Sequence, residues 1–447
     1  MKTEAEEMVH WPVGGSTAYR TTKCTGWVLA AKLARDKAKA LGVLRPAPPN
    51  EPAERGTLMH HWLEVGLTLA HELTGDVSPA RADMVHVISS YYTSHETNED
   101  AELLGVDDDA SAIAEAILDK VYPTMVESEA AYPKAKRLET WIEKSFTEQR
   151  PQYEDIIGGT TDFGCIYYDE NDVLTLAIAD FKSGDGELQE VNPGAINTVL
   201  AQMAFYAALA YWDASAEHDI KQVELTVWHA WRDAFVPTSV LFLLEDFLDL
   251  WNGEMHAGIY AAAAAMETGD PAGTSLAAGS WCKYCPCAAQ CPELYRSAHQ
   301  ALRLDTGEAS NLGKVLDLVP ALEELVTSAQ KLATDAVKGG TKIPGHKLVI
   351  NSKRETWDDT TSEEWLAFRG AMKKTNHALV KTGKETFATP KAMKKALGLS
   401  DEEFKLAHGD LTSTSISHKV VPETDRRKAV LSTDAMRDAL KQLEMRT

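Results

Sequence analysis

Two aspartates and one lysine stand where a β-hairpin is expected, and their side chains suit metal-assisted hydrolysis. Asp162 lies in the first predicted strand, and Asp180-Phe181-Lys182 ends the second. Neighbouring carboxylates repel each other, and a divalent cation relieves that repulsion. A lysine two residues further on could orient or activate an attacking water and help to neutralise a phosphate. The alternative is an exposed Asp–Lys pair at a strand end, since D-x-K is a common tripeptide.

The register of this hairpin decides how close the two carboxylates come. A turn centred on Glu170-Asn171 sets Asp162 opposite Ala179, one position away from Asp180. A one-residue bulge or an odd-length loop would instead set the two aspartates side by side. Both alternatives keep them neighbours at one end of the hairpin.

A histidine precedes the hairpin on a predicted helix. Residues 55–75 have helical periodicity and end in a glycine, and His60 and Glu64 share one face of this helix. His61 is the adjacent alternative to His60, and either histidine alone would more often be packed or solvated. His60 is therefore a candidate ligand for the same cation as the aspartates.

A second helix follows the hairpin and carries two polar candidates. Residues 195–213 are rich in alanine and predict a helix, on which Gln202 and Tyr206 lie one turn apart on the same face. The order along the chain is thus a helical histidine, a hairpin aspartate, Asp-x-Lys and a helical Gln/Tyr pair.

Four of the six cysteines fall within W-C-K-Y-C-P-C-A-A-Q-C-P, residues 281–292. The spacing of Cys282, Cys285, Cys287 and Cys291 could form a local zinc site. However, the single residue between Cys285 and Cys287 is tight for a tetrahedral pair, and that residue is a proline. Without Cys287 a triad remains that lacks one ligand, and Cys24 can supply it from far upstream. We expect the sixth cysteine, at position 165, to pack in the core.

The elements that must position these residues alternate between helix and strand. Further helices are predicted at 84–95, 108–127, 241–268 and 313–337, besides a loop that enters a helix within 15–41. Further strands are predicted at 223–231 and 346–356, and two or three short helices follow the second of these. We expect a domain boundary near 305–312, where the sequence reads D-T-G-E-A-S-N-L.

Composition describes an acidic globular protein of more than one domain. The chain has 447 residues, of which 44% are hydrophobic and 25% charged, and a net charge of −22. The charge is uneven, because residues 331–447 hold 22 Lys and Arg against 16 Asp and Glu, and the rest is strongly acidic. This lowers the expectation of non-specific duplex binding by the whole surface but leaves local grooves open. No apolar run is long enough for a membrane span and no secretory signal is evident, so we expect a cytoplasmic protein that does not bind membranes.

The order of these motifs resembles the RecB-like branch of the PD-(D/E)XK nuclease superfamily. The matching stretches are G-T-L-M-H (56–60), G-G-T-T-D-F (158–163), I-A-D-F-K-S-G (178–184) and Q-M-A-F-Y (202–206). The resemblance implies an α/β fold with a restriction-endonuclease-like core, in which helices and helical insertions flank a mixed central sheet. A smaller α+β C-terminal domain follows. One departure is Thr161, which replaces the proline of the superfamily's name.

The resemblance also assigns roles to residues. It implies that His60, Asp162 and Asp180 hold Mg²⁺ or Mn²⁺, and that Lys182 assists the attacking water. Gln202 and Tyr206 become supporting or DNA-contacting residues. Hard oxygen ligands suit Mg²⁺, and a histidine would also admit Mn²⁺.

The cysteine pattern is similar to the iron–sulfur subset of RecB-like nucleases, which includes CRISPR-associated exonucleases. In that subset one cysteine before the nuclease core and three after it hold a [4Fe–4S] cluster. Here Cys24, Cys282, Cys285 and Cys291 would hold the cluster. Zn²⁺ with Cys287 as the fourth ligand remains the alternative.

The C-terminal part is similar to an uncharacterised phage family that joins a RecB-like module to a conserved extension. The stretches that carry this similarity are 342–357 and 418–430. We therefore expect a nuclease domain over 1–305 and an accessory domain over 306–447 that binds DNA or a partner.

The function implied is a metal-dependent deoxyribonuclease in the cytoplasm of a phage host. Most directly it would be an exonuclease in recombination or replication. Its partners would be DNA with a free end or a single strand, and a single-strand annealing or replication protein. The alternative is a non-catalytic DNA-binding or scaffold protein that retains the nuclease fold.

Overall fold

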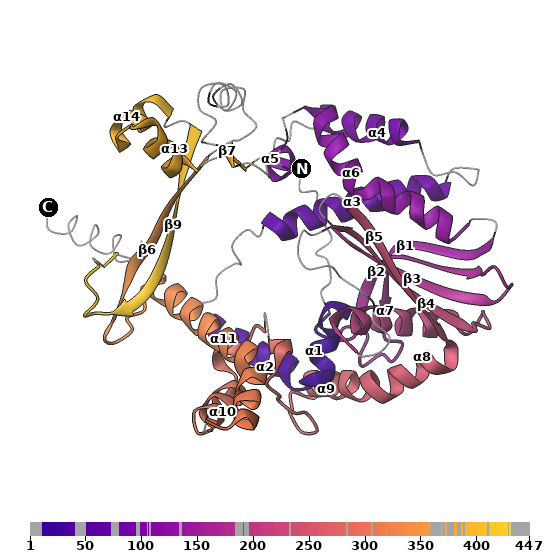
Figure 1. The fold of residues 1–447 in the computed structure, drawn as a ribbon. Coiled ribbons are helices and arrows are strands. Elements are labelled where there is room, and N and C mark those ends of the chain that lie inside the picture. Colours follow the sequence, from indigo (N-terminus) through magenta and orange to yellow (C-terminus); the bar gives the residue numbers. More distant parts are fainter. Residues whose placement is uncertain are drawn as a thin grey trace, which may run out of the picture. The chain divides into compact units, whose positions relative to one another are not determined.

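The computed structural model forms two compact units, drawn in Figure 1. One unit comprises Met1–Ser90 and Ala114–Val326, and the other comprises Tyr91–Ile113 and Thr327–Thr447. The described residues are 11–40, 51–72, 80–94, 99–104, 106, 109–133, 136–183, 191, 196–231, 234–282, 285–304, 307–357, 368, 372, 380–381, 386–387, 389–408, 411–427 and 429–430. The division expected between residues 305 and 306 falls on two positions outside these ranges and stays a prediction.

The first unit contains a five-stranded mixed sheet in the order β1-β2-β3-β4-β5. Its strands are β1 (Arg137–Thr147), β2 (Gly158–Tyr168), β3 (Leu174–Lys182), β4 (Gln222–Trp231) and β5 (Ala234–Leu243). Neighbours pair antiparallel except β3 and β4, which are parallel and joined through helix α7 (Thr198–Ala214). This arrangement confirms the expectation of a mixed α/β fold with helices flanking a mixed central sheet.

Helix α7 packs its small and aromatic side chains against the sheet. Alanines and leucines fill most of its buried positions, and the Asn197 side chain caps its start by accepting a hydrogen bond from Leu200 N at 2.8 Å. The core beneath it includes Leu176 and Ile178 of β3, alternate residues that share one face of the sheet. Because α7 is anchored along its length, the polar residues on it have fixed positions relative to β3.

In Figure 1 some of the other helices of this unit lie above or below the sheet, and others lie to one side of it at the lower left. They are α1 (Ala18–Lys23), α2 (Trp27–Ala40), α3 (Glu51–Glu72), α8 (Leu244–Leu250), α9 (His256–Thr268) and α10 (Pro292–Ala301), with parts of α4 (Arg81–Ser94), α6 (Ala110–Ala131) and α11 (Ala309–Lys338). A π-helical segment, Trp251–Met255, joins α8 to α9. Within the described ranges no helix is long and apolar enough to cross a membrane.

The second unit is built on one long antiparallel pair. Strands β6 (His346–Trp357) and β9 (Thr412–Pro422) pair along their whole length. Two short helices, α13 (Pro390–Leu397) and α14 (Asp401–His408), contribute Met393 and Phe404 to a small core. This α+β content agrees with the character expected for the C-terminal part of the chain.

Two strands of the central sheet were not expected from the sequence. Strand β1 has no simple alternation of buried and exposed residues. Strand β5 contains Pro237, which is tolerated because β5 is an edge strand paired only with β4. The helix expected from residue 241 starts at Leu244 instead, since β5 continues to Leu243. The hairpin, α7, β4, α11 and β6 are confirmed.

Candidate functional site

Strands β2 and β3 part at the position of the two aspartates. Their pairing runs from Tyr168↔Leu174 to Phe163↔Ala179 and ends there, although both strands continue. The next position in this register holds Asp162 on β2 and Asp180 on β3. The five-residue loop 169–173 produces this register, so the odd-length-loop alternative is the one that occurs.

Asp162 bridges the gap that opens between the strands. Its Oδ2 accepts a hydrogen bond from Phe181 N at 2.6 Å, which replaces a bond of the sheet ladder. Its Oδ1 lies 3.2 Å from His60 Nδ1 on α3, and the His60 ring packs edge-on against Phe181 at 5.5 Å between centroids. His61 is exposed beside it and makes an edge-on ring contact with Trp62 instead. The structure thus brings His60, and not His61, to the aspartate.

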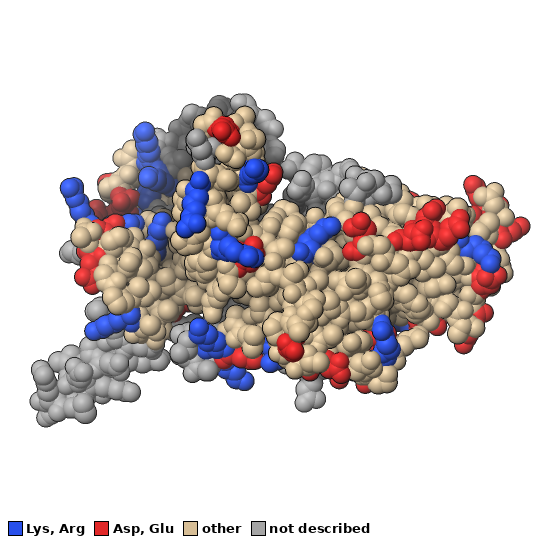
Figure 2. Space-filling model, turned by 90° about the horizontal axis from the view of Figure 1, so that it is seen from below, with Lys and Arg blue, Asp and Glu red and all other residues tan. Residues whose placement is uncertain are grey.

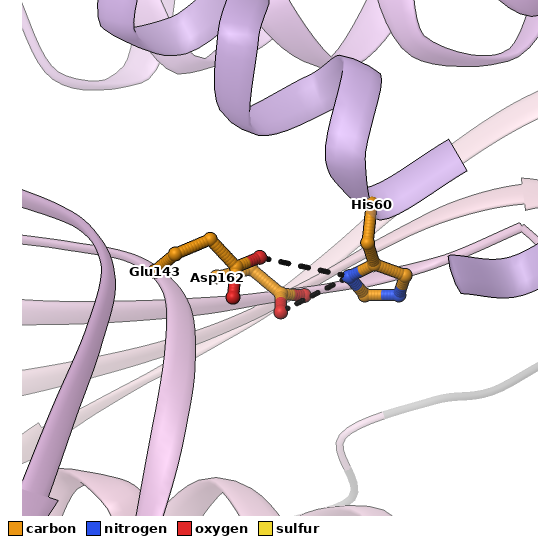
Figure 3. A group of neighbouring side chains, drawn as sticks. All are labelled: His60, Glu143 and Asp162. Atoms are coloured by element: carbon orange, nitrogen blue, oxygen red, sulfur yellow. Dashed lines mark ion pairs between the residues drawn. The ribbon is translucent and has the colours of Figure 1, made fainter. Parts of the chain in front are cut away.

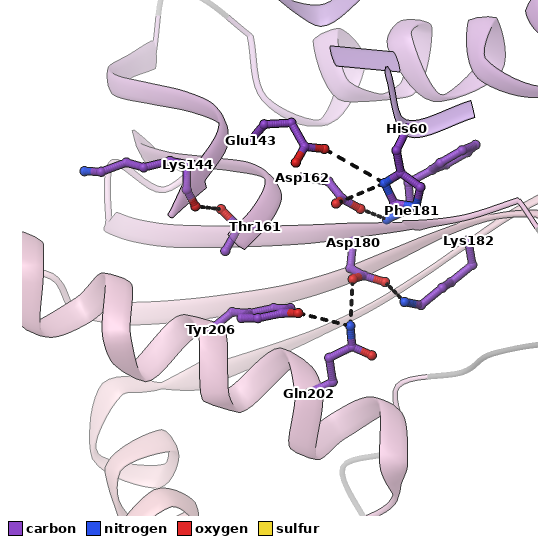
Figure 4. Close-up of polar contacts among 10 residues, drawn as sticks. All are labelled: His60, Glu143, Lys144, Thr161, Asp162, Asp180, Phe181, Lys182, Gln202 and Tyr206. Carbon is purple, nitrogen blue, oxygen red and sulfur yellow. Dashed lines mark hydrogen bonds and ion pairs between the residues drawn. The ribbon is translucent and has the colours of Figure 1, made fainter. Parts of the chain in front are cut away.

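Asp180 is the centre of a second set of contacts, shown with the first in Figure 4. Its Oδ2 lies 2.7 Å from Lys182 Nζ, and its Oδ1 accepts a hydrogen bond from Gln202 Nε2 at 3.0 Å. Gln202 Nε2 also lies 3.4 Å from the Tyr206 hydroxyl. All six residues expected from the sequence therefore lie in one cluster at the split of the sheet.

The cluster contains two buried acids, and each is paired with a basic side chain, Asp162 with His60 and Asp180 with Lys182. Burial raises the pKa of Asp180 above its usual range despite the nearby ammonium of Lys182. Burial acts the same way on Asp162, but the positive His60 and the Phe181 N–H outweigh it and hold the pKa of Asp162 below its usual range. For Lys182, burial lowers the pKa, but the Asp180 carboxylate outweighs it and raises that pKa. Lys182 is thus a cation near neutral pH.

His60 is held in its charged form in the same way. Burial lowers the pKa of the imidazole, but Asp162 and Glu143 outweigh burial and raise it to about 10. A proton on Nδ1 therefore occupies the place between the two carboxylates. A divalent cation would compete for that place and would displace the proton.

Glu143 on β1 is a residue of this cluster that the sequence did not indicate. Figure 3 shows its carboxylate beside that of Asp162, both facing His60. Its Oε1 lies 3.9 Å from His60 Nδ1, and burial raises the pKa of this carboxyl. No motif marks Glu143, because its position follows only from β1 being the strand next to β2.

The Tyr206 ring packs directly against two glycines, Gly15 in the N-terminal segment and Gly159 in β2. A Cβ on Gly15 would lie 2.3 Å from the tyrosine ring, and one on Gly159 would lie 2.5 Å from it. Real Cβ atoms do not approach so closely, so only glycine fits at either position. The G-S-T and G-G-T-T-D stretches therefore share the task of fixing the Tyr206 ring beside Gln202.

The cysteines form a second site within the same unit. A pocket there is lined by the thiols of Cys24, Cys282, Cys285, Cys287 and Cys291, together with Arg20, Trp27, Leu276, Ala277, Trp281 and Leu294. Cys24 belongs to the N-terminal segment but lies with Cys282, Cys285 and Cys291, the set that the sequence predicts, and Cys287, which that set leaves out, also lines the pocket. Cys165 is fully buried in the sheet, in agreement with its expected role in packing.

Hydrogen bonds fasten the Cys24 segment to the segment before Cys282. Gly26 N donates to Ser275 O at 2.9 Å, and Arg20 Nε donates to Trp281 O at 2.9 Å. Ala277 N donates to Cys24 Sγ at 3.4 Å. Backbone N–H groups directed at cysteine sulfur are among the contacts that tune iron–sulfur sites.

The thiols differ in acidity. Burial raises the pKa of Cys24 to about 11 and also raises that of Cys282. Cys285 and Cys287 lie 3.4 Å apart at their sulfurs, and this contact lowers the pKa of Cys285 to about 6 while it raises that of Cys287. Among the described residues no three thiol sulfurs lie within 4.8 Å of one another.

Comparison with known proteins identifies a family. The family model described as "Protein of unknown function (DUF2800)" matches residues 14–428. No curated protein matches the chain. Among solved structures, the chain is similar to one titled "Crystal structure of SSO0001", with 15% identity, a TM-score of 0.22, and coverage of 53% of this chain and 97% of that chain. The family match includes the hairpin, α7 and the cysteine segment.

Proposed function

The chain belongs to this family of proteins of unknown function, and we propose that it is a divalent-metal-dependent DNA nuclease of the RecB-like PD-(D/E)XK type. The reaction is hydrolysis of phosphodiester bonds, most directly as an exonuclease in phage recombination or replication. The observation that carries the proposal is the cluster at the split of β2 and β3, where Asp162, Asp180, Lys182 and His60 converge.

These residues fit a divalent cation. Asp162 and Asp180 are both more than nine-tenths buried, and Lys182 Nζ, at 2.7 Å, is the cation next to Asp180 Oδ2. Carboxylates and one imidazole are ligands that suit Mg²⁺ or Mn²⁺. His60, Asp162 and Asp180 would hold the ion, and the bound ion would stabilise the charge that develops on the phosphate.

The remaining residues of the cluster would position the attacking water and the substrate and would neutralise charge on the phosphate. Lys182 carries a positive charge close to Asp180, where it can bind a phosphate oxygen or hold the attacking water by a hydrogen bond. Gln202 donates to Asp180 and keeps that carboxylate in one orientation. Tyr206, beside Gln202, offers a hydroxyl to a substrate phosphate or sugar. Hydrolysis in such a site depends on orientation and charge more than on a strong base.

The cysteine pocket fits a [4Fe–4S] cluster better than one zinc ion. A zinc ion lies about 2.3 Å from each sulfur of a tetrahedral site, which sets the sulfurs about 3.8 Å apart. A four-iron cluster binds each thiolate through a different iron and so holds them farther apart. The Cys285 and Cys287 sulfurs lie 3.4 Å apart, but no three sulfurs of the described thiols lie within 4.8 Å of one another, as a tetrahedral zinc site would require; this supports the cluster, held by Cys24, Cys282, Cys285 and Cys291. The bound group would tie the N-terminal segment to the segment that follows α9.

Local charge is compatible with DNA despite the acidic total. The face drawn in Figure 2 carries blue and red side chains with broad tan stretches between them, so acidic residues do not cover it continuously. Helix α2, which follows Cys24, exposes Lys32, Arg35, Lys37 and Lys39. Exposed cations spaced along a helix suit the phosphate backbone, and a DNA end or single strand needs only a narrow basic path. A single-strand annealing or replication protein would deliver such a substrate.

The test is degradation of end-labelled DNA in Mg²⁺ or Mn²⁺ by the wild type, Lys182→Ala and Asp180→Asn. Asp213→Asn is the matched control, because Asp213 is an exposed carboxylate paired with Lys144 outside the cluster. We expect both cluster variants to lose about 100-fold or more in rate, and the control to keep wild-type activity. Equal degradation by all four proteins, or DNA binding by the wild type without any cleavage, would favour a non-catalytic binding or scaffold protein.

A further inference from the structure

Glu143 stands in the same row of the sheet as the two aspartates. The pairs Ile142↔Phe163 and Lys144↔Thr161 flank it without a register shift, so its position lies opposite Asp162. Asp162 in turn lies opposite Asp180 in the register of β2 and β3. Three adjacent strands therefore each present one carboxylate at the level where the sheet splits.

The backbone at Glu143 departs from its strand. Its φ is 48°, in the left-handed region, whereas the strand continues on both sides. This conformation is unfavourable for a residue with a Cβ, and glutamate has no side-chain contact with its own backbone that would favour it. Among the described residues it is one of two non-glycine positions with positive φ, and the other, Asp172, lies in the hairpin turn. The Glu143 side chain is directed to the cluster at this conformational cost.

The result is a compact set of three different ligand atoms. One atom each from His60, Glu143 and Asp162 lie within 4.8 Å of one another (Figure 3). They come from α3, β1 and β2, elements that pack together independently of any ion. Asp180, in contrast, has its two oxygens next to Gln202 and Lys182.

We propose that Glu143 is a further ligand of the divalent cation assigned to His60, Asp162 and Asp180, and that it binds this ion from the β1 side of the split. The inference rests on the proposed nuclease function for what the ion would do. Its test measures Mn²⁺ binding and does not depend on DNA cleavage. A set of one imidazole and two carboxylates suits Mn²⁺, while Mg²⁺ accepts fewer protein ligands and keeps more of its water. Loss of Glu143 should therefore weaken Mn²⁺ binding more than Mg²⁺ binding.

The test is titration of the full chain with Mn²⁺, followed by the loss of the free-ion electron paramagnetic resonance signal. Glu143→Gln keeps the size of the side chain and removes its charge. Asp213→Asn is the matched control, because Asp213 is an exposed carboxylate that pairs with Lys144 and belongs to no group of possible metal ligands among the described residues. We expect the Mn²⁺ dissociation constant to rise about 10-fold or more in Glu143→Gln and to stay unchanged in Asp213→Asn. An unchanged constant in Glu143→Gln overturns the proposal.

A second variant separates ligation from folding. Glu143→Asn shortens the side chain, and asparagine adopts the left-handed backbone conformation more readily than glutamine does. This variant should therefore fold even if Glu143→Gln does not. We expect the Tm of metal-free Glu143→Asn to equal or exceed that of the wild type, while the rise in Tm on adding Mn²⁺ becomes smaller. A full Mn²⁺-dependent rise in this variant contradicts a ligand role.

The outcomes for this inference and for the nuclease proposal are distinct. If the wild type cleaves DNA and Glu143→Gln binds Mn²⁺ as tightly, only the assignment of Glu143 fails. If the wild type cleaves no DNA but Glu143→Gln binds Mn²⁺ more weakly, the metal site stands and the nuclease proposal fails.

Discussion

Asp162 accepts a hydrogen bond from the backbone N–H of Phe181 at 2.6 Å, at the point where β2 and β3 cease to pair. A side chain thus takes the place of a ladder bond, and the two strands separate without leaving this donor unsatisfied. The separation makes room between Asp162 and Asp180 for groups that a continuous sheet would exclude. The candidate site is a consequence of this local break in pairing.

Tyr206 and Gly159 provide a packing test of the site. Gly159→Ala adds a Cβ 2.5 Å from the Tyr206 ring, so we expect a loss of about 1–3 kcal/mol in the free energy of unfolding. Combining it with Tyr206→Ala should recover part of that loss, as measured by urea denaturation. Gly313→Ala is the control, because no atom lies within 4 Å of its added Cβ. Additive effects of Gly159→Ala and Tyr206→Ala would show that the two positions are not in contact.

The cysteine assignment predicts a colour and its loss. Anaerobically prepared wild type should contain iron and absorb near about 400 nm. Serine at position 24, 282, 285 or 291 should remove most of the iron, while Cys287→Ser should retain it. The iron content per chain and the absorbance spectrum check this. One zinc per chain, lost in Cys287→Ser and kept in Cys24→Ser, would instead indicate the local zinc site.

Glu148 predicts how stability depends on acid. Burial raises the pKa of this carboxyl, but hydrogen bonds from Arg150 and Tyr260 outweigh burial and hold the pKa below its ordinary value. Its stabilising effect is therefore complete above the pKa of the unfolded chain and lost as the pH falls through the lower folded value. Between about pH 6 and 3 the Tm of the wild type should fall more steeply than that of Glu148→Gln. Parallel curves would show that these contacts contribute no pH-dependent stability.

Helix α2 predicts a salt-dependent contribution to DNA binding. Arg35 and Lys39 are exposed and one turn apart. Replacing both by alanine should weaken the binding of single-stranded DNA. It should also lower the magnitude of the slope of the logarithm of the binding constant against the logarithm of the salt concentration by about one to two, as expected for the loss of one or two phosphate contacts. Fluorescence anisotropy over a range of salt concentrations measures both. Lys314→Ala on α11 is the control for an exposed cation elsewhere in the same unit. An unchanged salt slope in the double variant would exclude α2 from the DNA path.

The sequence predicted those site residues that belong to a short motif on one helix, strand or loop. The hairpin, α7 and the cysteine segment each carry strong periodicity or spacing, and their residues lie together as expected. The hairpin register could not be settled, because a loop of four or five residues fits the polar turn equally well. Only the fold decided that Asp162 and Asp180 are opposite each other.

The place of Glu143 in the cluster could not be predicted from the sequence. Its strand has an irregular burial pattern, and nothing in T-W-I-E-K distinguishes this glutamate from a solvated one. Its place beside His60 depends on pairing between β1 and β2, and its direction depends on a left-handed backbone. Neither property is encoded in a local pattern of residue types.

The central claim is that the cluster at the strand split hydrolyses DNA. The most direct measurement is the rate of DNA cleavage by Lys182→Ala in Mn²⁺, made at DNA concentrations that saturate both variant and wild type. The account predicts that the wild type cleaves the DNA. Lys182→Ala should bind the same DNA with similar affinity, but its rate of cleavage should be lower by about 100-fold or more. Cleavage at the wild-type rate by Lys182→Ala would contradict it.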